Sequence, residues 1–225
     1  MMVIFFDLGT TLVYSTPSKE EVFRLICLEH GIRLDIEEIR NAYKKADVIF
    51  GGSAYLNYKG RTNEMYESLD KFLLNELGVR NDKLAKIVSS EFDHFIQWKI
   101  YPEVDSTLSY LYDRGYQLGI ISNIDSRILY ILRRVKIMKY FSTITYSQEV
   151  GVEKPDARIF QIALMKSNAS PGESFHIGDN YEHDVRGALS VGMIPILIDR
   201  EGKYPDVNCL KVSQLYETIS IIERR

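Results

Sequence analysis

Cysteine is scarce in this chain of 225 residues, which has only Cys27 and Cys209. They lie far apart, outside any Cys-x-x-Cys pair and in apolar surroundings, so buried thiols are favoured over a disulfide or a metal site. An excess of charge of one sign is also missing, because the formal net charge is only −3. We therefore expect neither a nucleic acid nor an anionic membrane surface as a partner.

Long apolar runs are absent as well. The apolar start of the chain is too short to span a membrane, and it has neither a basic leader nor a small-residue cleavage site. With 45% hydrophobic and 26% charged residues, 6 prolines and 14 glycines, the composition is globular and not disordered or fibrous. The expectation is a cytoplasmic protein that acts as a monomer or homodimer.

The most informative stretch that is present is the N-terminal run from Met2 to Leu12. It begins with uninterrupted apolar residues and then reaches Asp7, a glycine and two threonines. An apolar run without alternation is typical of a strand buried on both faces. Asp7 would then lie at the carboxyl end of that strand, where open parallel sheets bind ligands. On this motif alone, a turn-capping role for Asp7 is the alternative.

Residues 14–101 are predicted to form an all-helical insert. Ser18 and Glu21 have the spacing of a capping box, and Asp35 with Glu38 begins a second helix in the same way. Two more amphipathic helices are expected over about 63–77 and 82–98, and no strand pattern is found from 14 to 98. An aperiodic loop at 54–61 either selects substrate or is merely solvated; its candidate residues are Tyr55, Tyr58, Lys59 and Arg61.

Residues 1–13 and 102–225 are predicted to form an α/β core. Beyond residue 102, apolar strands at about 117–123, 142–146, 174–178 and 194–199 alternate with helical segments. This alternation predicts a parallel sheet with right-handed crossovers. The expected fold is a doubly wound parallel sheet with the helical insert directly after its first strand.

Four strands of this predicted sheet end on polar residues. They are Asp7, then Ser122 and Asn123, then Lys154, and finally Asp179 and Asp184. The carboxyl ends of parallel strands share one edge, so these groups should converge. Carboxylate oxygens suit Mg²⁺, a hydroxyl and an ammonium suit phosphate oxygens, and an aspartate can attack phosphorus. The set predicts a phosphoryl-transfer site.

Simpler roles exist for several of these residues. Ser122 could cap the following helix, which is compatible with phosphate binding at the same place. Asp184 could cap a helix or orient Lys154, and Lys154 itself could be an ordinary solvated lysine. His176 lies inside an apolar strand and is interpreted as a structural histidine. The remaining histidines are expected at the surface; they are His30, His94 and His183.

Four motifs in order make the chain resemble the haloacid dehalogenase-like superfamily. They are DLGTT (7–11), IISN (120–123), EKP (153–155) and GDNYEHD (178–184). The resemblance implies a Rossmann-like core, a helical cap, Mg²⁺ dependence and a small phosphorylated metabolite as substrate. It also implies these roles: Asp7 as nucleophile, Ser122, Asn123 and Lys154 around the phosphate, and Asp7, Asp179, Asp184 and the Gly9 carbonyl around the metal.

The chain departs from this pattern at Gly9. Phosphatases of the superfamily usually carry a second aspartate there as general acid and base, a role worth about 10²–10⁴ in rate. The expected phosphatase is therefore slow, or it takes its acid from elsewhere. The hydroxyls near Asp7 in the sequence, which are weak acids at neutral pH, are those of Thr10, Thr11 and Tyr14. The candidate acids in the cap are Glu64, Tyr55 and Tyr58.

Three other functions compete with a phosphatase. Loss of the acid would leave a phospholigand-binding or regulatory protein. The 2-haloacid dehalogenases of the superfamily also lack the second aspartate, but they need no metal, and the presence of Asp179 and Asp184 argues against this activity. Phosphonate hydrolases use a Schiff-base lysine from the cap, for which the candidates are Lys44, Lys45 and Lys59.

Overall fold

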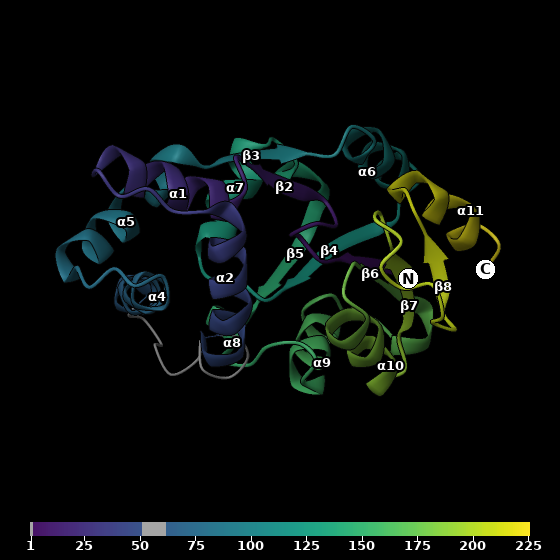
Figure 1. Cartoon of the computed structure of the whole chain (residues 1–225). Helices are drawn as coiled ribbons and strands as arrows, with labels where there is room; N and C mark the ends of the chain where they lie inside the picture. The colour runs from purple at the N-terminus through teal and green to yellow at the C-terminus, as the bar shows by residue number, and fades with distance from the viewer. Residues whose placement is uncertain (1, 51–61) are drawn as a thin grey trace. The chain divides into compact units, whose positions relative to one another are not determined.

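The computed structural model describes residues 2–50 and 62–225 (Figure 1). Two compact units make up the chain: an α/β unit of Met1–Tyr14 with Lys99–Arg225, and a helical unit of Ser15–Trp98. The aperiodic segment 54–61, with its four candidate residues, lies outside the described residues.

Six strands form the sheet of the α/β unit, in the order β5-β4-β1-β6-β7-β8. Every pairing between neighbours is parallel, which confirms the predicted Rossmann-like α/β class. The strands are β1 (Val3–Phe6), β4 (Gln117–Ser122), β5 (Phe141–Tyr146), β6 (Ser174–Gly178), β7 (Ile194–Ile198) and β8 (Leu210–Val212).

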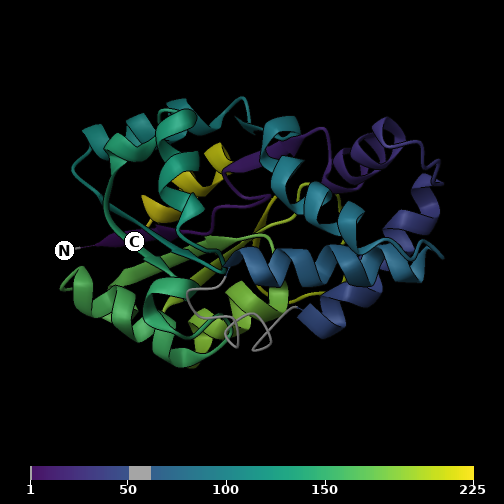
Figure 2. The same cartoon turned by 90° about the vertical axis from the view of Figure 1, so that its left-hand side faces the viewer.

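The N-terminal strand β1 lies between β4 and β6, so both of its edges are paired. All four of its residues are fully buried, and this explains why the run is apolar without alternation. Helices α9 (Ala157–Lys166) and α10 (Gly187–Ser190) cover one face of the sheet, while α6 (Val104–Asp113) and α11 (Thr218–Ile222) lie on the other (Figures 1 and 2).

Two shorter helices follow β4 and β5. They are α7 (Arg127–Arg134) and α8 (Ser147–Val150). The segment after β6 is a π-helical turn over Tyr181–Arg186 that continues into α10, and it takes the place of the single helix expected over 184–191. A 3₁₀ turn over Leu215–Glu217 precedes α11, close to the helix expected from residue 213.

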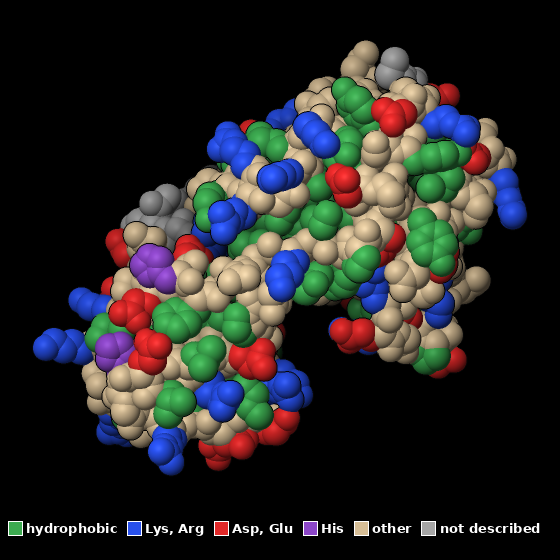
Figure 3. Space-filling model, turned by 90° about the horizontal axis from the view of Figure 1, so that it is seen from above, with side chains coloured by type: hydrophobic (Ala, Val, Ile, Leu, Met, Phe, Trp, Pro, Cys, Tyr) green, Lys and Arg blue, Asp and Glu red, His purple; other side chains and the backbone are tan. Residues whose placement is uncertain are grey.

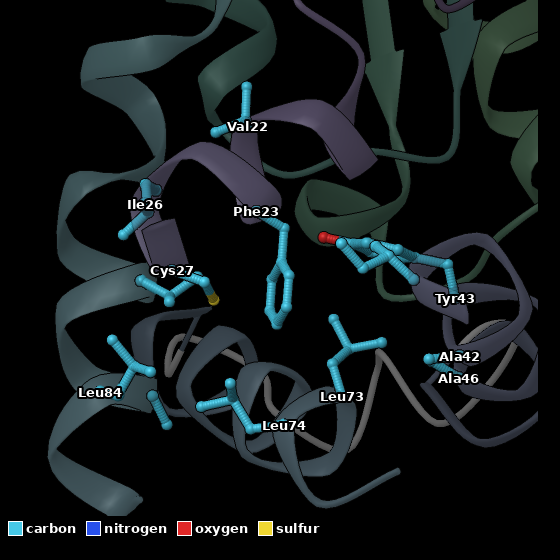
Figure 4. Packing of buried hydrophobic residues seen from close by; sticks show 13 residues of the cluster. Val22, Phe23, Ile26, Cys27, Ala42, Tyr43, Ala46, Leu73, Leu74 and Leu84 are labelled. Carbon is cyan, nitrogen blue, oxygen red and sulfur yellow. The ribbon is translucent and has the colours of Figure 1, made fainter. Parts of the chain in front are cut away.

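The helical unit contains the four expected helices. They are α1 (Lys19–Glu29), α2 (Ile36–Phe50), α4 (Thr62–Glu76) and α5 (Asp82–Phe95). The predicted capping box is confirmed, since Ser18 Oγ accepts from the Glu21 N–H and the Ser18 N–H donates to the Glu21 carboxylate. Phe23 of α1 packs among apolar side chains of the other helices, including Tyr43 and Leu73 (Figure 4).

The expectation that no strand occurs between residues 14 and 98 is wrong. Val13–Thr16 (β2) and Gln97–Ile100 (β3) form a two-stranded sheet, through which the chain passes from one unit to the other. Strands of four residues are too short to show alternation reliably, and the apolar residues near Trp98 extend the helical period of α5. For this reason the helix was expected to reach residue 98, whereas α5 ends at Phe95.

Cationic and acidic side chains are interspersed on the face of the molecule that Figure 3 presents. Several cationic side chains lie near one another in the upper middle of this view, with hydrophobic side chains between them. The described helices are also too short or too polar to cross a membrane.

Candidate active site

Asp7 directly follows β1, and its backbone N–H donates to the Ile177 carbonyl of β6 at 2.8 Å. One carboxylate oxygen, Oδ1, accepts hydrogen bonds from Ser122 Oγ at 2.9 Å and from Lys154 Nζ at 2.7 Å. The side chain is 12% exposed. The edge of the sheet thus brings together the carboxylate, the hydroxyl and the ammonium from three separate segments, as their positions after strands suggested.

Lys154 bridges two of the acids. Besides Asp7, its ammonium donates to Asp184 Oδ1 at 2.5 Å, and its side chain is only 3% exposed. Burial works against its charge, but the carboxylates of Asp184 and Asp7 keep the pKa of Lys154 above its ordinary value. An ordinary solvated lysine does not have this environment.

Asp184 is held by three donors. His176 Nε2 lies 2.9 Å from Oδ1, and the Asn180 N–H donates to Oδ2 at 2.9 Å, in addition to the bond from Lys154. Burial opposes the charge of Asp184, yet Lys154 and His176 hold its pKa below the ordinary value. Burial lowers the pKa of His176, so the imidazole is neutral and donates from Nε2.

Asn123 contacts the backbone of Lys154 through its side chain. Its Nδ2 donates to the Lys154 carbonyl at 2.9 Å, and its Oδ1 accepts from the Lys154 N–H at 2.7 Å. We interpret this reciprocal pair as a clamp that positions the lysine. It leaves one side-chain N–H of Asn123 for other contacts.

Asp179 completes the acidic group. Oxygen atoms of Asp7, Asp179 and Asp184 lie within 4.8 Å of one another. Burial, followed by the nearby charge of Asp7, raises the pKa of Asp179 to about 6. Three carboxylates share one ammonium, which leaves a buried excess of negative charge. Hard oxygen donors with two uncompensated charges fit a divalent cation such as Mg²⁺.

The carbonyl of Gly9, expected near the metal, accepts two hydrogen bonds within its own loop. Thr11 N–H donates to it at 2.6 Å and Thr10 Oγ1 at 2.7 Å. Both lone-pair directions of this oxygen are therefore in use by the loop. A metal-ligating role for Gly9 remains a prediction that would require this loop to rearrange.

Gly178 is required by the close approach of Asp184. A Cβ atom added at Gly178 would lie 2.1 Å from Asp184 Cγ. We predict that Gly178→Ala displaces Asp184 and lowers the free energy of unfolding by about 1–3 kcal/mol, as overpacking does. Urea unfolding and a Mg²⁺ titration measure both effects. Gly172→Ala is the matched control, because nothing lies within 4 Å of its added Cβ. Equal behaviour of the two variants would contradict the prediction.

Two features of the site were not anticipated from the sequence. The first is that His176, interpreted as merely structural, donates to Asp184. The second is Arg200, which contacts the loop after Asp7. Arg200 follows β7 at the same edge of the sheet as the four motifs, and this position was the available clue.

The parallel sheet gathers three aspartates and a lysine at the edge that follows its strands. The sequence model for haloacid dehalogenase-like hydrolases matches residues 1–192. The chain belongs to the haloacid dehalogenase-like hydrolases.

Relatives in this family include proteins named as phosphatases. The chain is 32% identical over 208 residues to the glyceraldehyde 3-phosphate phosphatase of Methanothermobacter thermautotrophicus, covering 89% of this chain and 87% of the relative. It is 30% identical over 177 residues to bovine haloacid dehalogenase-like hydrolase domain-containing protein 3, covering 75% and 70%.

Solved structures share the fold. The HAD phosphatase from Thermococcus onnurineus superposes with a TM-score of 0.65 at 22% identity, covering 99% of this chain and 98% of that one. A 2-haloacid dehalogenase from Pseudomonas syringae superposes with a TM-score of 0.69 at 24% identity, covering 100% and 99%. At these identities the likeness concerns the fold alone, so it does not separate phosphatase from dehalogenase.

Proposed function

We propose that this chain is a Mg²⁺-dependent phosphatase of small phosphorylated metabolites, with Asp7 as the nucleophile. The observation that carries the proposal is the arrangement of Lys154, whose buried ammonium bonds both Asp7 and Asp184. A cation in contact with the nucleophile offsets the repulsion between a carboxylate and a phosphate dianion. The phosphatases among the relatives support the same reaction class.

Asp7, Asp179 and Asp184 would hold the Mg²⁺ ion. When bound, the ion supplies positive charge and polarises a phosphoryl oxygen. Ser122 and Lys154 would bind the non-bridging oxygens of the phosphate and orient its phosphorus toward Asp7. Asn123 would position Lys154 through its hydrogen bond to the Lys154 backbone, and His176 would position Asp184 through its hydrogen bond to the carboxylate.

The chemistry divides into two steps. Asp7 forms a bond to phosphorus while the bond from phosphorus to the leaving oxygen breaks, and that oxygen departs as an anion that solvent then protonates. Water then attacks the phosphorus and the bond between phosphorus and the Asp7 oxygen breaks, which releases inorganic phosphate, passes the proton of the water to solvent and regenerates the Asp7 carboxylate. Gly9 provides no side chain to donate the first proton or accept one from the water. Both steps are therefore expected to be slow.

The test is hydrolysis of p-nitrophenyl phosphate with Mg²⁺, with EDTA, and by the variant Asp7→Asn. We expect phosphate release only by the wild type with Mg²⁺, and the rate of the enzyme-free blank in the other two cases. Asp113→Asn, the same chemical change at an exposed position, should behave as the wild type. Release that survives EDTA or Asp7→Asn would refute the proposal.

A phospholigand-binding protein without turnover is the second candidate, and Gly9 is the observation that favours it. Such a protein would bind inorganic phosphate with Mg²⁺ and release none from any ester over hours. Of the candidate lysines for a phosphonate-hydrolase reaction, Lys45 is 66% exposed and paired with Glu76 at 2.6 Å, and Lys59 lies outside the described residues. We also propose that the helical unit is a cap that selects the substrate.

A further inference from the structure

Arg200 is an enclosed cation next to the loop that follows Asp7. Its side chain is 12% exposed. Its Nη1 lies 2.7 Å from Glu103 Oε1, and its Cζ lies 3.6 Å from the centroid of the Tyr101 ring. The acid and the aromatic ring both belong to the α/β unit, so the guanidinium has a fixed position within that unit.

The rest of the guanidinium bonds the loop over residues 8–12. Nε donates to the Thr10 carbonyl at 3.2 Å and Nη2 donates to the Thr11 carbonyl at 2.9 Å. Thr10 has φ of 54°, a left-handed conformation that β-branched residues rarely adopt. Hydrogen bonds from a charged donor are roughly twice as strong as neutral ones. The two bonds from Arg200 can therefore maintain a loop conformation that Thr10 itself disfavours.

The same loop reaches the acids of the site. It starts at Asp7, and Thr11 Oγ1 lies 3.4 Å from Asp179 Oδ1. The N–H groups of Leu12 and Val13 both donate to the Leu8 carbonyl, at 2.9 and 3.0 Å, which closes the loop on itself. A change in the Thr10 and Thr11 carbonyls would therefore be transmitted to Asp7 on one side and Asp179 on the other.

We propose that Arg200 is a positioning residue of the active site. Its guanidinium, held by Glu103 and Tyr101, fixes the loop over residues 8–12 and so sets the separation of Asp7 and Asp179. An ordinary surface ion pair would not bury the arginine or bond two consecutive carbonyls. This role of Arg200 rests on the proposed function only where turnover is measured.

The experiment compares Arg200→Ala, Arg200→Lys and the control Arg158→Ala. Arg158 is 67% exposed and pairs with Asp156 of its own helix cap. For Arg200→Ala we expect a Mg²⁺ dissociation constant roughly 10–100-fold higher, as for other residues that orient ligands from behind. Amide hydrogen exchange at Leu12 and Val13 should become faster. Arg200→Lys should be intermediate, since one ammonium cannot reproduce the planar fork.

Chemical rescue separates positioning from a general loss of stability. Guanidinium at millimolar concentration should lower the Mg²⁺ dissociation constant of Arg200→Ala and raise its kcat, without effect on Arg158→Ala. If Arg200→Ala folds poorly, Glu103→Gln, which keeps the guanidinium, should show a smaller change of the same sign.

Two results would overturn the inference. One is a Mg²⁺ dissociation constant and an amide exchange pattern of Arg200→Ala equal to those of the wild type. The other is a loss of binding in Arg200→Ala that follows its melting temperature and is not rescued by guanidinium. A wild type that hydrolyses no phosphate ester refutes the proposed function instead, while the exchange and Mg²⁺ measurements still decide the role of Arg200.

Discussion

Gly9→Asp should raise the turnover of alkyl phosphates by about 100-fold or more, within the 10²–10⁴ range of general acid–base catalysis. The substitution supplies a carboxyl group two residues after Asp7, where it can protonate the leaving oxygen and later accept a proton from water. The backbone accepts the change, because a Cβ added at Gly9 meets nothing within 4 Å and Gly9 is not among the residues with positive φ. Steady-state kinetics on an alkyl phosphate measure the gain.

The dependence on the leaving group is the sharper measurement. Without a proton donor, the first step requires the leaving oxygen to depart as an anion, so kcat/KM of the wild type should fall steeply as the pKa of the leaving alcohol rises. Gly9→Asp should flatten this dependence across a series of aryl and alkyl phosphates. Gly172→Asp is the control, since its added Cβ also meets open space. A shallow dependence in the wild type would mean that another residue already supplies the proton.

The site residues that could be predicted from the sequence lie at the carboxyl ends of strands. Asp7 and Asp179 each directly follow a buried strand, Ser122 is the last residue of another, and parallel strands end at a common edge. Their convergence therefore required no knowledge of side-chain contacts. Lys154 was harder, because it precedes a helix and only the order of the motifs distinguished it from a solvated lysine.

Contacts across long sequence separations were not predictable in this way. Arg200 bonds carbonyls about 190 residues earlier in the chain, and nothing in a local pattern indicates which carbonyl a buried arginine will bond. The short strand β8 and the pair β2 and β3 were missed for a related reason. Strands of three or four residues are defined by their partners more than by their own alternation.

The buried carboxyl of Asp70 in α4 carries the second large prediction. Asp70 lies three and four residues before the buried Leu73 and Leu74, hence on the buried face of α4, and it is only 4% exposed. It belongs to the interior of the helical unit, where its charge adds to burial in raising the pKa of Cys27 to about 12 and in raising that of Tyr43. Burial is the cause given for the shifted pKa of this carboxyl, with no hydrogen-bond donor or cation opposing it.

Burial raises the pKa of Asp70 to about 8 from 3.8. In the folded protein it therefore holds a proton across a pH range in which the unfolded chain has already released it. The unfolded state binds fewer protons there, so the free energy of unfolding falls as pH rises from about 4 to about 8, by up to about 1.4 kcal/mol per pH unit. Above that range the total penalty is on the order of 5 kcal/mol.

Asp70→Asn and Asp70→Leu should remove this dependence. Near pH 4 to 5 the Asn variant should match the wild type, because a protonated carboxyl and an amide are similar in size and charge. At pH 9 both variants should unfold at clearly higher urea concentration than the wild type, followed by far-UV circular dichroism at each pH. Glu67→Gln, an exposed change on the same helix, is the control. If the difference between Asp70→Asn and the wild type stays constant from pH 5 to 9, the carboxyl is ionised in the folded protein and has a partner that stabilises its charge.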